Sequence, residues 1–132
     1  MRKVIVTNNP MVKEKYDKLM KVDFVDAYGY FDVLDTVRRH VHNGWIIETH
    51  PLSGSIKPNE TPYKSVVLQP VKEGAALDFS SLNLIEEAIQ TFRKFQSARS
   101  LPQWTEKAQK DFQMIDLSLI DSALPSMGLR HS

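Results

Sequence analysis

The chain has 132 residues, of which 42% are hydrophobic and 25% charged, a composition typical of one globular domain and not of a disordered chain. Its 17 basic and 16 acidic residues nearly balance, which argues against a dedicated nucleic-acid-binding protein, because such proteins carry a marked basic excess. Cysteine is absent, so disulfides, thiolate nucleophiles, iron–sulfur clusters and cysteine-ligated zinc are excluded.

The chain offers no candidate segment for export or membrane insertion. Only three apolar residues, at positions 4–6, follow the basic start, so we expect no signal peptide. No apolar stretch approaches the roughly 20 residues that a membrane-spanning helix needs. We therefore expect a cytoplasmic protein with neither a membrane nor a nucleic acid as its partner.

The first half of the chain alternates between strand and helix patterns. Asn9 is a good N-cap and Pro10 suits the first position of a helix, where its missing N–H costs nothing. Strands are predicted over residues 3–7, 22–26 and 45–49, with helices from residue 10 and over residues 31–43. The order β-α-β-α-β favours parallel strands joined by right-handed crossovers.

A proline-rich segment separates this half from a fourth strand. Residues 50–62 contain three prolines and one glycine and show hardly any periodicity. We interpret them as a loop, whose length of about a dozen residues is unusual in a compact domain unless the loop is functional or disordered. Residues 63–69 predict the fourth strand, whose direction relative to the third stays open.

Two long helices are predicted after the fourth strand. Asn83 and Glu86 approximate a capping box for the first of them, and Thr105 is placed to cap the second. Apolar residues at helical spacing predict the buried face of each: Leu82, Ile85, Ala88, Ile89, Phe92 and Phe95 in the first, and Trp104, Ala108, Phe112, Ile115 and Leu119 in the second.

These elements predict a single α/β domain over residues 1–125, followed by a flexible tail over residues 126–132. The predicted sheet is open, four-stranded and mostly parallel, with the order β-α-β-α-β-loop-β-α-α, and helices cover it as in a Rossmann-like sandwich.

Polar residues follow each of the first three predicted strands. Ligands of such sheets bind outside the carboxyl ends of the strands, so we predict one small-ligand or small-anion cleft there. The loop 50–59 adds two serine hydroxyls, accessible amides, a lysine and a histidine that suits acid–base or donor roles. The candidate ligand-binding residues are Thr7, Asn8, Asn9, Gly29, Tyr30, His50, Ser53, Gly54, Ser55 and Lys57.

Several candidates also have a structural interpretation. Asn9 serves as a helix cap, and Gly29 permits a positive φ before the second helix. The loop 50–59 is equally explained as a proline-stiffened surface segment with solvated polar side chains. Lys64 and Ser65 line the same cleft if the fourth strand runs antiparallel to the third.

Familiar catalytic and cofactor motifs are missing. The chain has no glycine-rich dinucleotide or phosphate loop and no Gly-x-Ser-x-Gly elbow, so no cofactor and no catalytic residue is assigned. His40 and His42 are two residues apart and diverge on a helix, so we predict no metal site.

Two segments resemble the small GrdX-type proteins encoded beside the glycine, sarcosine and betaine reductase complexes of amino-acid-fermenting anaerobes. The first is Val-Ile-Val-Thr-Asn-Asn-Pro at residues 4–10. The second is Thr-His-Pro-Leu-Ser-Gly-Ser at residues 49–55, continuing to Pro-Tyr-Lys-Ser at residues 62–65. The resemblance implies a cytoplasmic accessory role in a multi-component reductase system and no particular chemistry.

Two functional hypotheses follow. In the first, the chain is an accessory protein whose cleft binds a small anion, such as a carboxylate or phosphate, or another small ligand. In the second, it is a non-catalytic assembly or maturation partner of a reductase subunit, and the loop 50–62 is its docking surface. Leu52 and Ile56 would then be the apolar anchors of that surface.

Overall fold

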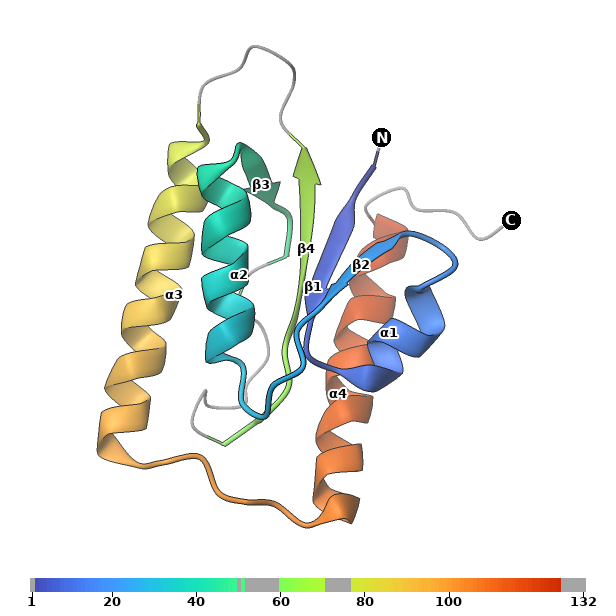
Figure 1. Ribbon diagram of the computed structural model, residues 1–132, viewed down its shortest axis with the longest axis vertical. Helices are drawn as coiled ribbons and strands as arrows, with labels where there is room; N and C mark the ends of the chain where they lie inside the picture. Colours follow the sequence, from blue (N-terminus) through green and yellow to red (C-terminus); the bar gives the residue numbers. More distant parts are fainter. Residues whose placement is uncertain (1, 50, 52–59, 71–76, 127–132) are drawn as a thin grey trace.

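The computed structural model describes residues 2–49, 51, 60–70 and 77–126. The eight predicted elements are present in the predicted order (Figure 1). They are β1 (Val4–Thr7), α1 (Pro10–Tyr16), β2 (Lys21–Phe24), α2 (Phe31–His42), β3 (Trp45–Ile47), β4 (Ser65–Pro70), α3 (Phe79–Ala98) and α4 (Glu106–Ser126).

The sheet is mixed, so the prediction of a mostly parallel, Rossmann-like sheet was wrong. Its strand order is β2-β1-β4-β3, and only β1 and β2 are parallel neighbours. Strand β4 lies between β1 and β3 and is antiparallel to both. The reason lies in the connection before β4, because a parallel neighbour needs a crossover, usually a helix, and the proline-rich residues 50–62 carry no helical pattern.

Strands β1, β2 and β3 run in one direction, since β1 and β3 are both antiparallel to β4. Their carboxyl ends are staggered along the sheet. Thr7 at the end of β1 is level with Phe24 in β2 and with Ser65 at the start of β4. Ile47, the last residue of β3, is level with Leu68, as is Val4 at the start of β1. One end of the sheet therefore gathers the ends of β1 and β2 and the beginning of β4.

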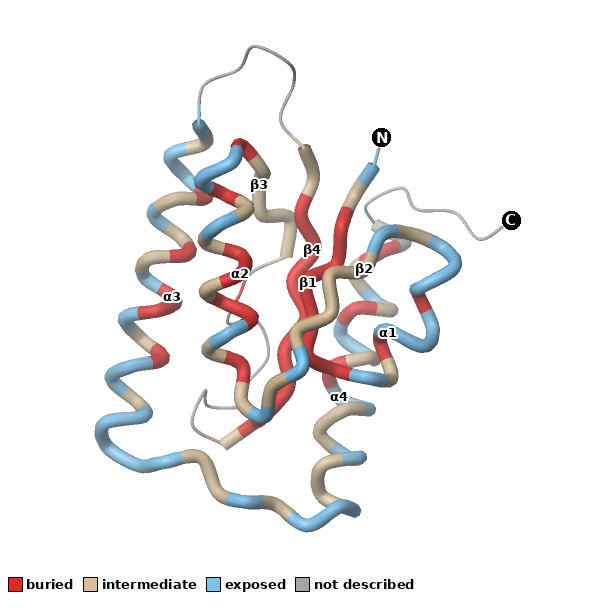
Figure 2. Tube along the Cα trace, in the orientation of Figure 1, coloured by how far each residue is buried: buried red, intermediate tan, exposed pale blue. Residues whose placement is uncertain are grey.

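Helices cover both faces of the sheet, with α2 and α3 on one side and α1 and α4 on the other (Figure 1). Successive side chains of a strand point to opposite faces, so Val4 and Val6 pack toward α2 and α3 while Ile5 packs toward α1 and α4. Figure 2 shows β1 and β4 buried through the middle of the molecule. Burial on both faces explains why these strands are apolar without alternation.

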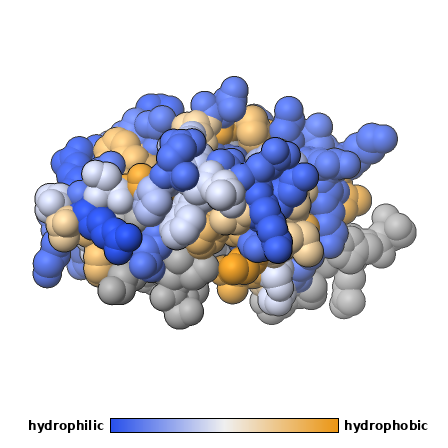
Figure 3. All heavy atoms as spheres, turned by 90° about the horizontal axis from the view of Figure 1, so that it is seen from below, coloured by the Kyte–Doolittle hydropathy of each residue, from blue (hydrophilic) through white to orange (hydrophobic). Residues whose placement is uncertain are grey.

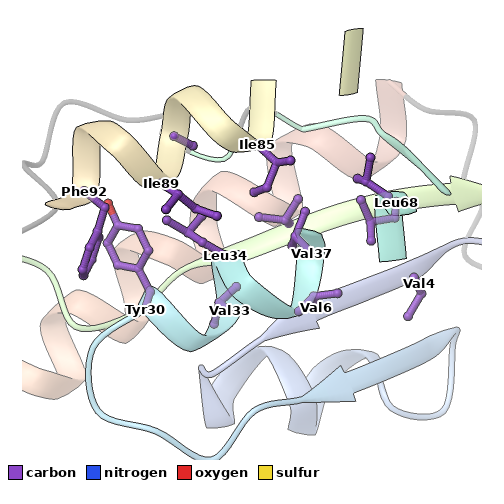
Figure 4. Packing of buried hydrophobic residues seen from close by; sticks show 13 residues of the cluster. Val4, Val6, Tyr30, Val33, Leu34, Val37, Leu68, Ile85, Ile89 and Phe92 are labelled. Atoms are coloured by element: carbon purple, nitrogen blue, oxygen red, sulfur yellow. The ribbon is translucent and has the colours of Figure 1, made fainter. Parts of the chain in front are cut away.

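The buried face of α3 agrees with the predicted one, with Ile85, Ala88, Ile89 and Phe92 packed in the core (Figure 4). Its cap is Asp78, whose carboxylate accepts from the Ser81 amide, so the predicted capping box at residue 83 was wrong.

Helix α4 begins after the predicted cap, because the Thr105 hydroxyl accepts from the Ala108 amide at 3.2 Å. Its predicted apolar face was wrong in part. Ile115 and Leu119 are 44% and 39% exposed, whereas Asp116, Ile120 and Leu124 are buried. The hydrogen bonds of Asp116, described below, turn this side of the helix toward the sheet.

Candidate functional site

Asn8 is buried at the end of the sheet where β1 ends, and its side chain connects several segments of the chain. Its side-chain nitrogen lies 3.1 Å from the Ala27 carbonyl oxygen, 3.2 Å from that of Gly29 and 2.7 Å from that of Pro62. Its side-chain oxygen accepts from the Lys64 amide at 2.9 Å. The amide group of Asn8 therefore holds together the end of β1, the segment before α2 and the segment before β4.

Gly29 and Tyr30 form the turn into α2. Gly29 has a φ of 90°, as its structural interpretation predicts, and its amide donates to the Pro62 carbonyl at 3.1 Å. Tyr30 is 2% exposed, and its ring meets the edge of Phe92 with centroids 5.1 Å apart (Figure 4). Burial raises the pKa of the Tyr30 hydroxyl well above its ordinary value. Tyr30 thus contributes to the core.

Asn9 caps α1 as predicted and also binds α4. Its side-chain oxygen accepts from the Met11 amide at 3.0 Å. Its side-chain nitrogen donates to the Gln113 carbonyl at 2.9 Å and to Asp116 Oδ2 at 3.0 Å. One asparagine therefore connects the beginning of α1 to the middle of α4.

A chain of hydrogen bonds, which we call the polar cluster, runs through Thr7, Asn9, Ser65 and Asp116. Asp116 Oδ1 accepts from the Ser65 amide at 3.0 Å, and Asp116 Oδ2 accepts from the Ser65 hydroxyl at 2.6 Å. The Thr7 and Ser65 hydroxyl oxygens lie 2.6 Å apart, and Thr7 Oγ1 accepts from the backbone N–H of Asn9. Ser65 is only 2% exposed, so this arrangement suits a structural link better than a nucleophile.

Lys64 and Asp116 are the buried ionisable groups at this place, 5% and 4% exposed. Burial raises the pKa of the Asp116 carboxyl, against the hydrogen bonds from Ser65 and Asn9 and the charge of Lys64. Burial also lowers the pKa of the Lys64 ammonium group to about 8, against the charge of Asp116. Shifted pKa values of this kind occur at functional sites and also in structural networks of charges.

A pocket of about 290 Å³ lies beside Gly29, between the beginning of α2, the end of α3 and the connection that follows α3. Tyr28, Phe31 and Phe92 supply aromatic surface, and Asp32 and Gln96 supply polar groups. Residues 100, 101 and 103 complete the described lining. Figure 3 looks at this end of the molecule, where small hydrophobic areas are scattered among hydrophilic ones.

The connection between α3 and α4 is hydrogen-bonded across the same end of the sheet. The Tyr28 hydroxyl donates to the Pro102 carbonyl at 2.5 Å and accepts from the Trp104 amide at 3.0 Å. The Trp104 indole donates to the Glu60 carbonyl at 2.7 Å, and Gln109 donates to the Trp104 carbonyl at 2.9 Å. These bonds fix one wall of the pocket.

The structure brings together part of the predicted ligand-binding set. Thr7, Asn8 and Asn9 lie beside Lys64 and Ser65, because β4 is antiparallel, but all five are buried. Gly29 lines the pocket and Tyr30 lies in the core. The predicted residues of the loop lie outside the described part of the chain: His50, Ser53, Gly54, Ser55 and Lys57.

Sequence reasoning missed Asp116 and the pocket residues of α2 and α3. Asp116 carried a usable signal, since it stands at helical spacing between Phe112 and Ile120, where a charge on an apolar face needs buried partners. Asp32 carried none, because an acidic residue in the first turn of a helix is common.

The described residues contain no group of three or more histidine, cysteine, aspartate or glutamate side chains arranged to hold a metal ion. None of their helices is long and apolar enough to cross a membrane.

The family model described as GrdX-like protein matches residues 4–125. The chain belongs to the GrdX-like family. The match confirms the resemblance seen in the two sequence motifs, and it extends from β1 into α4. No curated protein and no solved structure matches the chain.

Proposed function

We propose that this GrdX-like protein is a cytoplasmic accessory protein of a glycine-type amino-acid reductase system and that it works by binding a small ligand. Family membership and the motifs at residues 4–10 and 49–55 support the association with a reductase. The pocket between α2 and α3 is the observation that carries the binding activity. No catalytic residue is part of the proposal.

The place and size of the pocket support a small ligand. It lies just beyond the carboxyl end of β2, where the chain turns into α2, and ligands of open α/β sheets bind at such ends. Its volume of about 290 Å³ is near the lower limit of ordinary ligand pockets, which begin at roughly 300 Å³. Aromatic walls with a few polar groups are also the usual lining of such pockets.

Thermal unfolding in the presence of candidate ligands tests this proposal. The panel contains phosphate, acetyl phosphate, glycine, choline and nucleotides, each at several concentrations. A ligand present at about 100 times its Kd adds about 2.7 kcal/mol to the free energy of unfolding, which is a clear rise in Tm. The absence of any rise with the whole panel would contradict the proposal.

A matched pair of variants assigns the binding to the pocket. Ser100 lines the pocket and is exposed, so S100W fills the opening without disturbing the core. Ser97 is exposed on α3 and is not among the described lining residues, so S97W is its control. We expect S100W to lose the ligand-induced rise in Tm and S97W to keep it.

A second proposal is that residues 50–62 dock onto a reductase subunit. Its support in the structure is that the described residues at both ends are held, since Pro51, Thr61 and Pro62 are buried and the Trp104 indole binds the Glu60 carbonyl. Co-purification from expressing cells tests it. A complex with a reductase subunit that Leu52→Asp disrupts is the expected result, and a protein that always purifies alone would contradict it.

A further inference from the structure

The pocket carries a negative charge on its described lining. Among those residues Asp32 is the one that is charged at neutral pH, and none is lysine, arginine or histidine. Asp32 lies in the first turn of α2, where the helix dipole favours a negative charge. A small anion placed in this pocket would face the Asp32 carboxylate, so the lining favours a ligand of the opposite charge.

The aromatic rings of the pocket favour the same charge. Phe31 and Phe92 lie with ring centroids 5.7 Å apart and planes inclined at 49°, and the exposed Tyr28 has its hydroxyl fixed by Pro102 and Trp104. Cations are attracted to the faces of such rings. The Arg93 guanidinium carbon lies 5.4 Å from the centroid of the Phe31 ring, so Phe31 already holds a cation of the chain itself and a ligand cation would rely more on Tyr28, Phe92 and Asp32.

We infer that the ligand of this pocket is a small ammonium compound whose charge lies between the aromatic rings and the Asp32 carboxylate. The inference rests on the proposed function, which requires only that some small ligand binds there. It adds the chemical class of that ligand, and it differs from the anion that the sequence alone suggested. Quaternary ammonium groups suit such a lining especially, since aromatic surfaces recognise them without a need for hydrogen-bond donors.

Isothermal titration calorimetry with a matched pair of probes tests the inference. Choline carries the charge, and dimethylbutanol, its neutral carbon isostere, has nearly the same shape. We expect choline to bind at least about tenfold more tightly than the isostere, as one desolvated cation–aromatic contact allows. Sodium acetate at equal ionic strength is the anionic probe, and we expect no binding from it.

Asp32 has a matched control in Asp26. Both side chains are exposed, and Asp26 is not among the described residues of the lining. We expect D32N to weaken choline binding about fivefold or more, and D26N to leave it within about twofold of the parent value. Both variants keep the volume of the side chain and lie on the surface, so each is expected to fold.

The outcomes separate this inference from the proposed function. Equal binding of choline and its isostere, tighter binding of acetate, or unchanged choline binding in D32N overturns the ammonium assignment and leaves a ligand pocket in place. No binding of any probe, together with no rise in Tm across the panel, overturns both. Charge-dependent binding that D32N weakens and D26N does not supports both.

Discussion

Two regions meet at the same end of the sheet and use their polar groups in opposite ways. In the polar cluster of Thr7, Asn9, Ser65 and Asp116, hydrogen bonds within the chain join buried side chains and attach α4 to β1 and β4. In the pocket, Asp32 and Gln96 face a space of about 290 Å³ beside aromatic rings. A buried polar group needs partners within the protein, whereas a polar group on an open pocket is available to a ligand.

In this protein, the shifted pKa values of Lys64 and Asp116 and the polar residues of the motif at residues 4–10 belong to the structural region and not to the pocket. The Lys64 and Asp116 pKa values are perturbed because both groups are buried at the junction with α4. Substitutions in the cluster should therefore change the free energy of unfolding. Substitutions on the pocket should change ligand binding and leave the free energy of unfolding nearly unchanged.

Asp116→Ala should have the largest effect. It leaves the Ser65 amide, the Ser65 hydroxyl and the Asn9 side-chain amide without their buried acceptor. We expect a loss of about 3 kcal/mol in the free energy of unfolding, measured by urea denaturation, because each buried group left unsatisfied costs about 1–3 kcal/mol. Asp111→Ala, on the exposed side of α4, is the control. A loss below about 1 kcal/mol for Asp116→Ala would show that the cluster does not hold α4 in place.

Asn8→Asp tests the hydrogen bonds that the Asn8 side chain makes at the end of β1. The substitution replaces a donor that faces three carbonyl oxygens with a carboxylate oxygen. We expect a destabilisation of about 2 kcal/mol by urea denaturation, since the carbonyls lose their donor and face a like charge. Asn83→Asp, which is exposed on α3, should stay within about 0.5 kcal/mol. Equal effects of the two variants on the free energy of unfolding would contradict a structural role for Asn8.

Gly29→Ala tests the turn into α2, where Gly29 also lines the pocket. A side chain at this φ of 90° is strained, and its Cβ would lie 3.2 Å from Leu101 Cδ2. We expect a loss of about 1–2 kcal/mol in the free energy of unfolding, the usual cost of such backbone strain. Because both residues line the pocket, choline titration of the folded variant should also show weaker binding. Full stability with full binding would contradict the geometry at residue 29.

Lys64→Met tests the burial of the lysine through the pH dependence of stability. The pKa of Lys64 is about 8 in the folded chain and 10.5 in a free lysine, so its contribution is fully present above pH 10.5 and is lost as pH falls through about 8. The parent protein should therefore gain stability from pH 8 to 9, by up to about 1.4 kcal/mol per pH unit.

The Met variant should lose most of this slope, and Lys13→Met on the exposed face of α1 should keep it. Urea denaturation at several pH values measures the slopes. Tyr16 and Tyr30 have raised pKa values, so ionisation of the unfolded chain near the ordinary tyrosine pKa of 10.0 lowers stability from above about pH 9, and the slopes are compared between pH 8 and 9. An unchanged slope in Lys64→Met would mean that Lys64 is not buried as described.

Local signals predicted much of this fold, while long-range partners did not. The cap at Asn9, the positive φ at Gly29 and the buried stripe of α3 follow from neighbouring residues, and the structure has all three. The position of β4 between β1 and β3 depends on strand pairing across more than 50 residues of chain, which no local pattern encodes. The same is true of Asp116, whose partners Asn9 and Ser65 are distant in the sequence.

Of the predicted ligand-binding residues that the structure describes, Gly29 lines the pocket, and the pocket's other lining residues are not among those candidates. Asn8 and Asn9 looked available because a sequence does not show which backbone groups they bond. The pocket residues of α3 looked like ordinary parts of an amphipathic helix, and only the packing of α3 against the beginning of α2 places them beside Asp32.

Titration of choline into the isotopically labelled protein, followed by backbone amide NMR shifts, decides between the pocket and the polar cluster as the ligand site. We expect concentration-dependent shifts centred on Gly29, Asp32, Gln96 and Leu101, with smaller changes at Ser65 and Asp116. Shifts centred on Ser65 and Asp116, with residues 28–32 unchanged, would contradict it and would make the polar cluster the binding site.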